Sequence, residues 1–376
     1  TRDTVDDRLR LDGTESRPLS EREARDIVKE LRRRGDVDRD ELGLTLQQVI
    51  QWEDVLREAT TAAVRAAVLS AALQAAPHLI AIGRKALETG EVDMRFRMLN
   101  DQVEIIEQIP NVELVSTAAT SPWLIWVNNE NPALSDPAVR LALNYGFDRN
   151  GLTQTLLRGL VEPAYNLIPP SSWAYSEEAV EAYAYDPDRA RQLLDEAGWV
   201  DENGDGVREK DGETLSFDIL NIAGEPERVQ ILSFIQDQWS EIGVQVNIQN
   251  VDVATMWGDA LPSGNYDMGY SYSGRLADPA DLAQHYLCPD KQPTTNWGLY
   301  CNPELDEILL AAQATVNQTE RADLYAQALE MIGQNPAYVF IGWRTDHTPI
   351  NQRVQGYKPA PGFIEMWNAE EWSVQE

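Results

Sequence analysis

Between residues 215 and 248 the spacing of apolar residues changes twice, from alternate positions to helical spacing and back. Residues 215–220 alternate apolar and polar side chains, which is the pattern of a half-buried strand. Residues 226–242 have helical spacing and stop before Gly243, and residues 244–248 alternate again. A strand, a helix and a strand with short connections form a right-handed crossover in which the two strands are parallel. The stretch therefore predicts an α/β lobe with a parallel strand pair at 215–220 and 244–248.

Two helices that precede this unit begin with the same signal. Ser135 and Asp136 stand before Pro137, and either can cap the first helix, while Asp186 stands before Pro187. An aspartate can cap a helix, and proline suits the first turn because its missing N–H would have no partner there. Gly198 provides a stop for the second helix. Both segments are therefore expected to be amphipathic helices that cover the sheet.

The composition changes near residue 90. The first hundred residues carry 17 of the 31 basic residues and only 19 of the 62 acidic ones, with Trp52 and Phe96 as their only aromatic residues. A change of this size indicates a domain boundary. We predict a helical or partly disordered segment of unknown role at 1–88 and a connecting segment at 89–120. An α/β lobe at 121–350 and a C-terminal segment at 351–376 would follow.

Charge and motif content exclude several classes of function. The formal net charge of −31 falls almost entirely after residue 100, and such a surface repels nucleic-acid phosphates, so the C-terminal lobe is not expected to bind nucleic acid. The histidines, His78, His285 and His347, have no catalytic spacing, so we expect no enzymatic activity. No apolar run is long enough to span a membrane, and the charged first residues do not resemble a signal peptide.

The segment DENGDGVREKDGE, residues 201–213, opens like a calcium loop. It places acidic or amide oxygens at alternate positions before a glycine. The twelfth position, where an EF-hand has a glutamate, is Gly212, so a neighbouring acid would have to substitute. The alternative is a Gly/Asp-rich turn without a metal. The predicted ligands of this structural calcium are Asp201, Asn203, Asp205, the Val207 carbonyl and Asp211, and no other cofactor is expected.

The two cysteines, Cys288 and Cys301, lie in one polar stretch. In an oxidising compartment they would form a disulfide that stabilises the fold by about 3 kcal/mol for a loop of this size. Two separate thiols are the alternative. Metal binding is disfavoured because the sequence has no CxxC pair.

The segment around these cysteines is also the candidate ligand surface. It is rich in aromatic side chains with polar tips, which suit a wet cleft, and it follows a predicted strand at 266–271. Open α/β sheets bind ligands at the carboxyl ends of their strands. In the alternative, the aromatic residues pack the core and Asp278 only caps a helix that begins at Pro279. The predicted ligand-binding residues are Tyr270, Tyr272, Arg275, Asp278, Asn296 and Trp297.

Several motifs occur in a fixed order after residue 90, and together they resemble the family 5 extracellular solute-binding proteins. Those proteins are the peptide and nickel receptors of ABC importers. The motifs are GEVD at 90–93, DPAVRLALNYGFDRNGL at 136–152, YDPDRARQLLDEAGW at 185–199, the loop at 201–206, GLYCNPELDEIL at 298–309 and RVQGYKP at 353–359.

The resemblance implies a type II clamshell, in which two α/β lobes close over a peptide, a metal chelate or a sugar. The receptor would hand its ligand to a membrane permease from the periplasm or the cell exterior. In peptide-binding members an aspartate after this strand pairs with the α-amino group of the ligand, and Asp278 is the matching residue. The usual tryptophan of that loop is absent, and Arg275 in its neighbourhood would favour an anionic group instead.

The first ninety residues do not share the resemblance. We therefore expect an incomplete clamshell preceded by a helical segment. The alternative is a ligand-sensing regulator, in which an N-terminal helical DNA-binding segment is fused to a solute-binding lobe.

Overall fold

The computed structural model describes residues 84, 86–96, 98, 100–274, 278–291, 295–360 and 366–375. The chain forms two compact units. The second unit runs from Ala118 to Thr345, and the first contains the described residues up to Thr117 together with Asp346–Ala360 and those after Ile364. The helices expected at 1–88 fall almost wholly outside the described residues, and the predicted domain boundaries stay predictions.

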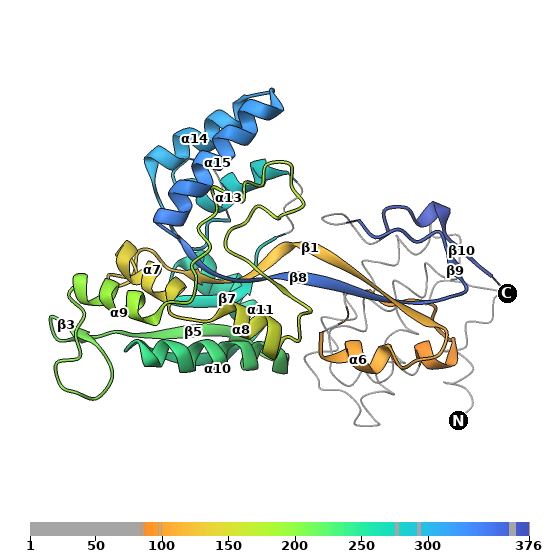
Figure 1. The fold of residues 1–376 in the computed structure, drawn as a ribbon, viewed down its shortest axis with the longest axis horizontal. Helices are drawn as coiled ribbons and strands as arrows, with labels where there is room; N and C mark the ends of the chain where they lie inside the picture. Colours follow the sequence, from red (N-terminus) through yellow and green to blue (C-terminus); the bar gives the residue numbers. More distant parts are fainter. Residues whose placement is uncertain are drawn as a thin grey trace. The chain divides into compact units, whose positions relative to one another are not determined.

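A six-stranded mixed sheet is the framework of the second unit (Figure 1). Strand β5 pairs in parallel with both β6 and β7, while β7 pairs antiparallel with β1. Ser216 of β5 is in register with Gln245 of β6, so the predicted parallel pair is confirmed. In sheet order the strands are β2 (Glu162–Pro163), β8 (Tyr338–Asn351), β1 (Val112–Val127), β7 (Met268–Tyr272), β5 (Ser216–Ile222) and β6 (Gln245–Val251).

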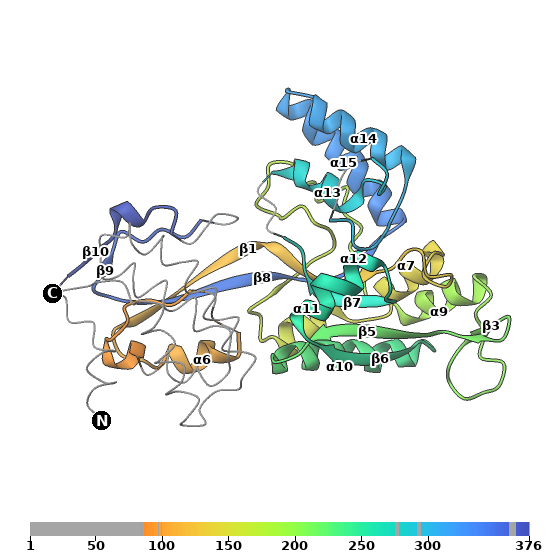
Figure 2. The same ribbon diagram turned by 180° about the vertical axis from the view of Figure 1, so that it is seen from behind.

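Helix α10 (Pro226–Glu241) makes the crossover between β5 and β6 and lies along both strands (Figure 2). Gly243 ends the helical segment with a φ of +84°, a conformation that favours glycine. Ile231, Ile235 and Trp239 of this helix are fully buried. The indole Nε1 of Trp239 donates to the Leu143 carbonyl at 2.9 Å. The crossover helix is therefore fixed to a second helix as well as to the sheet.

That second helix is α7 (Pro137–Tyr145), which packs against α9 (Pro187–Glu196). Both caps form as predicted, because Asp136 accepts from Ala138 N and Asp186 accepts from Arg189 N. Together with α10 these helices cover one face of the sheet. The large buried side chains of this core include Ile125, Leu143, Phe147, Leu194, Phe217, Ile219, Trp239 and Tyr270.

The motif at 136–152 carries two buried arginines. Arg149 donates to the carbonyls of Phe340 (2.8 Å) and Asn144 (2.6 Å), and its guanidinium lies 4.2 Å from the Phe147 ring centroid. Arg140 donates to the Pro336 carbonyl at 2.7 Å. Burial lowers the pKa of each guanidinium to about 10. The motif is therefore structural, since its arginines attach α7 to the start of β8.

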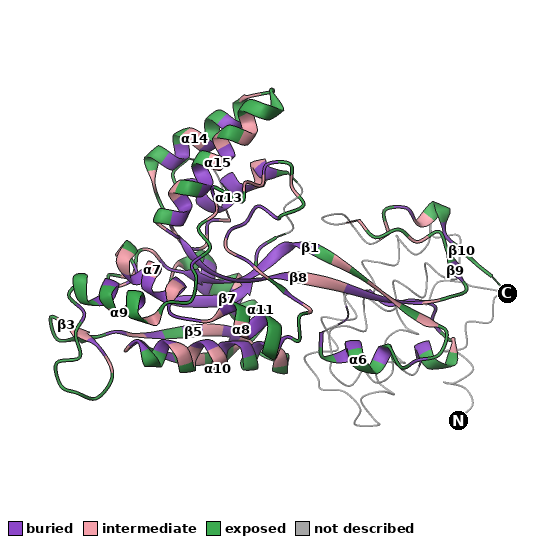
Figure 3. Cartoon of the chain, viewed as in Figure 1, coloured by how far each residue is buried: buried purple, intermediate pink, exposed green. Residues whose placement is uncertain are grey.

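The opposite face of the sheet is covered by α13 (Leu282–Tyr286), α14 (Pro303–Ala314) and α15 (Gln318–Gln334). The last two form an antiparallel pair that projects from this unit (Figure 1). Aromatic rings dominate this second core, and burial follows the inward faces of the helices and strands (Figure 3). Its largest members include Trp126, Tyr286, Tyr325, Tyr338 and Phe340.

The first unit has a small core of its own in the described residues. Met94, Phe96 and Trp372 pack together with the end of β8 and with β9 (Val354–Gln355). Arg353 pairs with Asp93 at 2.5 Å and donates to the Gly90 carbonyl at 2.8 Å. The motifs at 90–93 and 353–359 therefore meet in space. No helix in the described part of the chain is long and apolar enough to cross a membrane.

Candidate functional site

The carboxyl end of β7 presents an aromatic ring to solvent. Tyr272, the last residue of the strand, is 43% exposed, and the Arg344 guanidinium lies 4.4 Å from its ring centroid. Beyond the strand, Ser273 N donates to the Pro122 carbonyl at 3.2 Å, so this end of β7 stays attached to β1. A ring and a guanidinium at the carboxyl edge of an α/β sheet have the position and chemistry of a ligand surface.

Two other predicted ligand residues belong to the core. Tyr270 is fully buried, with the Arg228 guanidinium 4.7 Å from its ring centroid, and burial raises the pKa of its phenol. Asn296 is 4% exposed, and its amide donates to the carbonyls of Leu287 and Tyr300 at 3.0 and 2.7 Å. For both residues the structure matches the alternative in which this segment packs the core.

Asp278 caps the short helix η5 (Pro279–Asp281). Its Oδ1 accepts from Ala280 N at 2.9 Å, and Asp281 accepts in return from Asp278 N at 3.2 Å. The same Oδ1 accepts from Arg321 Nη2 at 2.9 Å. The carboxylate predicted to meet a ligand amine is thus engaged by this chain's own groups. Arg275 lies outside the described residues.

Trp297 lies near the amino end of β7, at the opposite end of the strand from Tyr272. Its ring centroid is 6.2 Å from that of Trp257, and its neighbour Gly298 accepts from Asn129 N at 2.8 Å, just past the end of β1. Strand β1 runs antiparallel to β7, so the end of β1 at Val127 lies beside Met268, the first residue of β7. Along the five residues of β7, Met268 is about 13 Å from Tyr272. The predicted ligand residues are therefore not brought together. A disulfide between Cys288 and Cys301 closes the loop that contains Trp297.

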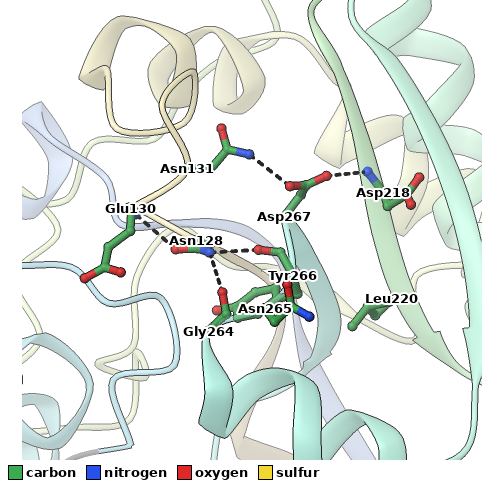
Figure 4. A pocket seen from close by; sticks show the side chains of 9 residues that line it. All are labelled: Asn128, Glu130, Asn131, Asp218, Leu220, Gly264, Asn265, Tyr266 and Asp267. Carbon is green, nitrogen blue, oxygen red and sulfur yellow. Dashed lines mark hydrogen bonds between the residues drawn. The ribbon is translucent and has the colours of Figure 1, made fainter.

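A polar pocket of about 450 Å³ lies near the amino end of β7 and was not predicted from the sequence (Figure 4). Amides hold its walls, because Asn131 donates to Asp267 at 2.9 Å and Asn128 donates to the Tyr266 carbonyl at 2.8 Å. The backbone N–H of Asp218 donates to Asp267 at 3.0 Å. The sequence feature that could have indicated this pocket is the group of asparagines at 128, 129 and 131, directly after β1. The lining residues are Asn128, Glu130, Asn131, Asp218, Leu220, Gly264, Asn265, Tyr266 and Asp267.

The loop at 201–209 gathers three carboxylates. Oxygens of Asp201, Asp205 and Glu209 all lie within 4.8 Å of one another. Asn203 donates to Asp205 at 3.0 Å and to Glu209 at 2.5 Å, so its amide nitrogen faces these oxygens. Asp211, which was predicted as a ligand, is not in this group, because it lies with a φ of 54° in the turn between β3 (Glu209–Lys210) and β4 (Glu213–Thr214). Glu209, which the sequence pattern did not single out, lies with Asp201 and Asp205 instead.

Comparison with known proteins agrees with this architecture. The oligopeptide-binding protein AppA of Bacillus subtilis is 29% identical over 292 residues, which cover 76% of this chain and 52% of AppA. The dipeptide-binding protein of Escherichia coli is 26% identical over 265 residues, covering 68% of this chain and 46% of that protein.

Solved structures of solute-binding proteins superpose on this chain. AppA from B. subtilis in complex with a nonapeptide superposes with a TM-score of 0.72 at 26% identity, covering 79% of this chain and 58% of that one. NikZ from Campylobacter jejuni in complex with Ni(L-His) gives 0.70 at 26% identity, covering 78% and 59%. The chain spans about half the length of the curated relatives it matches. Residues 82–294 match the middle part of family 5, and the chain belongs to the bacterial extracellular solute-binding proteins of that family.

Proposed function

We propose that this chain is the solute-binding component of an ABC importer and that its ligand is a peptide. The family match over residues 82–294 carries the proposal. The names of its relatives support a peptide, since they include oligopeptide-, dipeptide- and di/tripeptide-binding proteins. The regulator alternative depends on the first residues of the chain, which lie outside the described part, and no relative favours it. We also propose that the chain binds without catalysing a reaction, as its family does.

Tyr272 is the described residue best placed to contact the ligand. Its exposed ring stands at the carboxyl end of β7, where open α/β sheets bind their ligands. An aromatic face can stack on peptide groups, while the phenol can exchange hydrogen bonds with the peptide backbone. Arg344, beside this ring, adds a positive charge that suits a carboxylate or a carbonyl. The edge therefore offers contacts that do not depend on the peptide's side-chain sequence.

The proposed partner is a membrane permease, and the proposed location is the periplasm or the cell exterior. The disulfide between Cys288 and Cys301 supports this location, because disulfides persist in oxidising compartments. Membership in an extracellular family supports it independently.

A binding assay with a matched control tests the proposal. Random pools of synthetic dipeptides to nonapeptides would be titrated into the full chain, with detection by native mass spectrometry and calorimetry. We expect Tyr272→Ala to weaken peptide binding at least tenfold, because the ring contact is lost. Tyr185→Ala is the control, since Tyr185 is 40% exposed in the same unit but belongs to no strand and directly precedes the Asp186 cap of α9.

Two outcomes would contradict the proposal. If no peptide in any pool binds while Ni(L-His) does, the ligand class is wrong. If both tyrosine variants weaken binding equally, peptides bind but Tyr272 is not at the site.

A further inference from the structure

Three polar side chains from distant parts of the sequence meet in the first unit. His347 of β8 lies between Ser116 of β1 and Asn100, the first residue of the short helix η2 (Asn100–Gln102). Its Nδ1 is 2.9 Å from Ser116 Oγ, and its Nε2 is 2.9 Å from Asn100 Oδ1. The three side chains therefore form one continuous line of hydrogen bonds.

The backbone brings these residues together. Strands β1 and β8 are neighbours in the sheet and run side by side (Figure 1). Met98 N donates to the His347 carbonyl at 3.0 Å, and this bond holds the segment before η2 beside β8. The sequence gave His347 no catalytic spacing, because Ser116 and Asn100 are 231 and 247 positions away from it.

The contact with Asn100 decides which imidazole nitrogen carries the proton. An amide oxygen can only accept, so Nε2 of His347 donates to Asn100 Oδ1 and Nδ1 keeps its lone pair. The hydroxyl of Ser116 therefore donates to Nδ1. A hydroxyl that donates to a neutral imidazole, whose other nitrogen is held by a third group, is the arrangement that activates a serine as a nucleophile.

Burial varies along this line as such an arrangement requires. Ser116 is exposed, whereas His347 and Asn100 are 1% and 7% exposed. Burial lowers the pKa of His347, and the neighbouring Asp346 opposes this shift only in part, so the imidazole is neutral at pH 7 and can accept a proton. A reagent in solution can therefore reach the hydroxyl, while the imidazole behind it is shielded from water.

We infer that Ser116 is a nucleophile activated by His347 and is a site of covalent modification by reactive acyl or phosphonyl compounds. Ser116 Oγ forms the new bond to carbon or phosphorus, its proton passes to His347 Nδ1, and the leaving group departs with the bonding electron pair. Asn100 is a positioning residue, because it acts on the hydroxyl only through the imidazole. The inference is independent of peptide binding and concerns a single transfer, not turnover.

Labelling of the full chain with a fluorophosphonate tests the inference. Attack by Ser116 forms an O–P bond and releases fluoride, so intact mass spectrometry follows the reaction and peptide mapping assigns the residue. Ser135 is the internal control, because it is also exposed and its hydroxyl donates to the Pro132 carbonyl at 2.8 Å in place of an imidazole. We expect Ser116 to be labelled at least about tenfold faster than Ser135, since a positioned general base contributes about a hundredfold or more.

Variants separate the roles of the three residues, with circular dichroism to check that each remains folded. Ser116→Ala should lose the fast label, and His347→Gln should slow it at least about tenfold. Asn100→Leu should slow it too, whereas Asn100→Asp keeps an acceptor oxygen for Nε2 and should be labelled no more slowly than the wild type. A merely structural role of Asn100 would leave the labelling rate of both folded variants unchanged.

Two results would overturn the inference. One is labelling of Ser116 in the wild type less than tenfold faster than that of Ser135. The other is a folded His347→Gln chain that is labelled at the wild-type rate. If His347→Gln does not fold, the comparison of the two serines in the wild type and the pair of Asn100 variants still decide the matter.

Discussion

His285 shows how a single buried side chain links stability to pH. It lies in α13 with 5% exposure, stacked on Trp126 with ring centroids 5.7 Å apart. Burial lowers its pKa from 6.5 to about 4, and the nearby Asp281 opposes this shift only in part. Below pH 6.5 the unfolded chain takes up a proton on this histidine, whereas the folded chain does not until about pH 4.

The sign of the effect follows from this difference. Because the unfolded state binds more protons between pH 6.5 and 4, the free energy of unfolding falls as the pH falls through that window. For this shift the loss is about 3 kcal/mol. We expect His285→Gln to show a shallower decline than the wild type when unfolding in urea is measured from pH 7 to 4.5. Burial also lowers the pKa of His347, but this residue is the same in both proteins, so its contribution cancels when the two curves are compared. Parallel curves would contradict the prediction.

Residues also show where the sequence was insufficient. Tyr270 and Tyr272 lie on the same face of β7, since they are two positions apart. Tyr270 is fully buried and in contact with Arg228, whereas Tyr272 is 43% exposed. The residues that cover this face of the sheet therefore end between the two tyrosines. Alternation along a strand shows which residues share a face, but it does not show how far the covering elements extend. The partner of Asp278 was hidden for a similar reason, since Arg321 is 43 positions away.

At the scale of elements, prediction succeeded where the cause was local. The caps of α7 and α9, the stop at Gly243 and the parallel crossover depend on residues within a few positions of one another. The polar pocket could not be predicted, because Asn131 and Asp267 are 136 positions apart. The loop at 201–213, predicted to bind calcium, falls between these cases. The spacing of its acidic residues could be recognised in the sequence. Whether Asp211 or Glu209 would face the other acids depended on the turn between β3 and β4.

The loop at 201–209 supplies a prediction at this scale. A calcium site there stays a prediction, and it requires Glu209 as a ligand. We expect millimolar calcium chloride to raise the melting temperature of the EDTA-treated chain, because a cation that binds only the folded state stabilises it by about 2.7 kcal/mol at a hundred times its Kd. Glu209→Gln should remove the increase, and Asp211→Asn should preserve it, since Asp211 lies outside the group of facing oxygens. An unchanged melting temperature in the wild type would show that the loop is a turn without a metal.

At the scale of the whole molecule, the chain combines a large acidic α/β unit with a smaller unit. The described members of both cores of the second unit all lie after Ala118. Strands β1 and β8 extend from that unit into the first, where Met94, Phe96 and Trp372 form a separate core.

This arrangement predicts the effect of a truncation. Residues 1–83 carry a single aromatic residue, Trp52, whereas the described cores are rich in large buried rings from Phe96 onward. We expect a chain that lacks residues 1–83 to remain soluble and to unfold cooperatively in urea, with a midpoint close to that of the full chain. Circular dichroism and tryptophan fluorescence should report the same transition. Loss of cooperative unfolding would mean that residues 1–83 complete a core on which the α/β unit depends. In that event, peptide binding would have to be measured on the full chain alone.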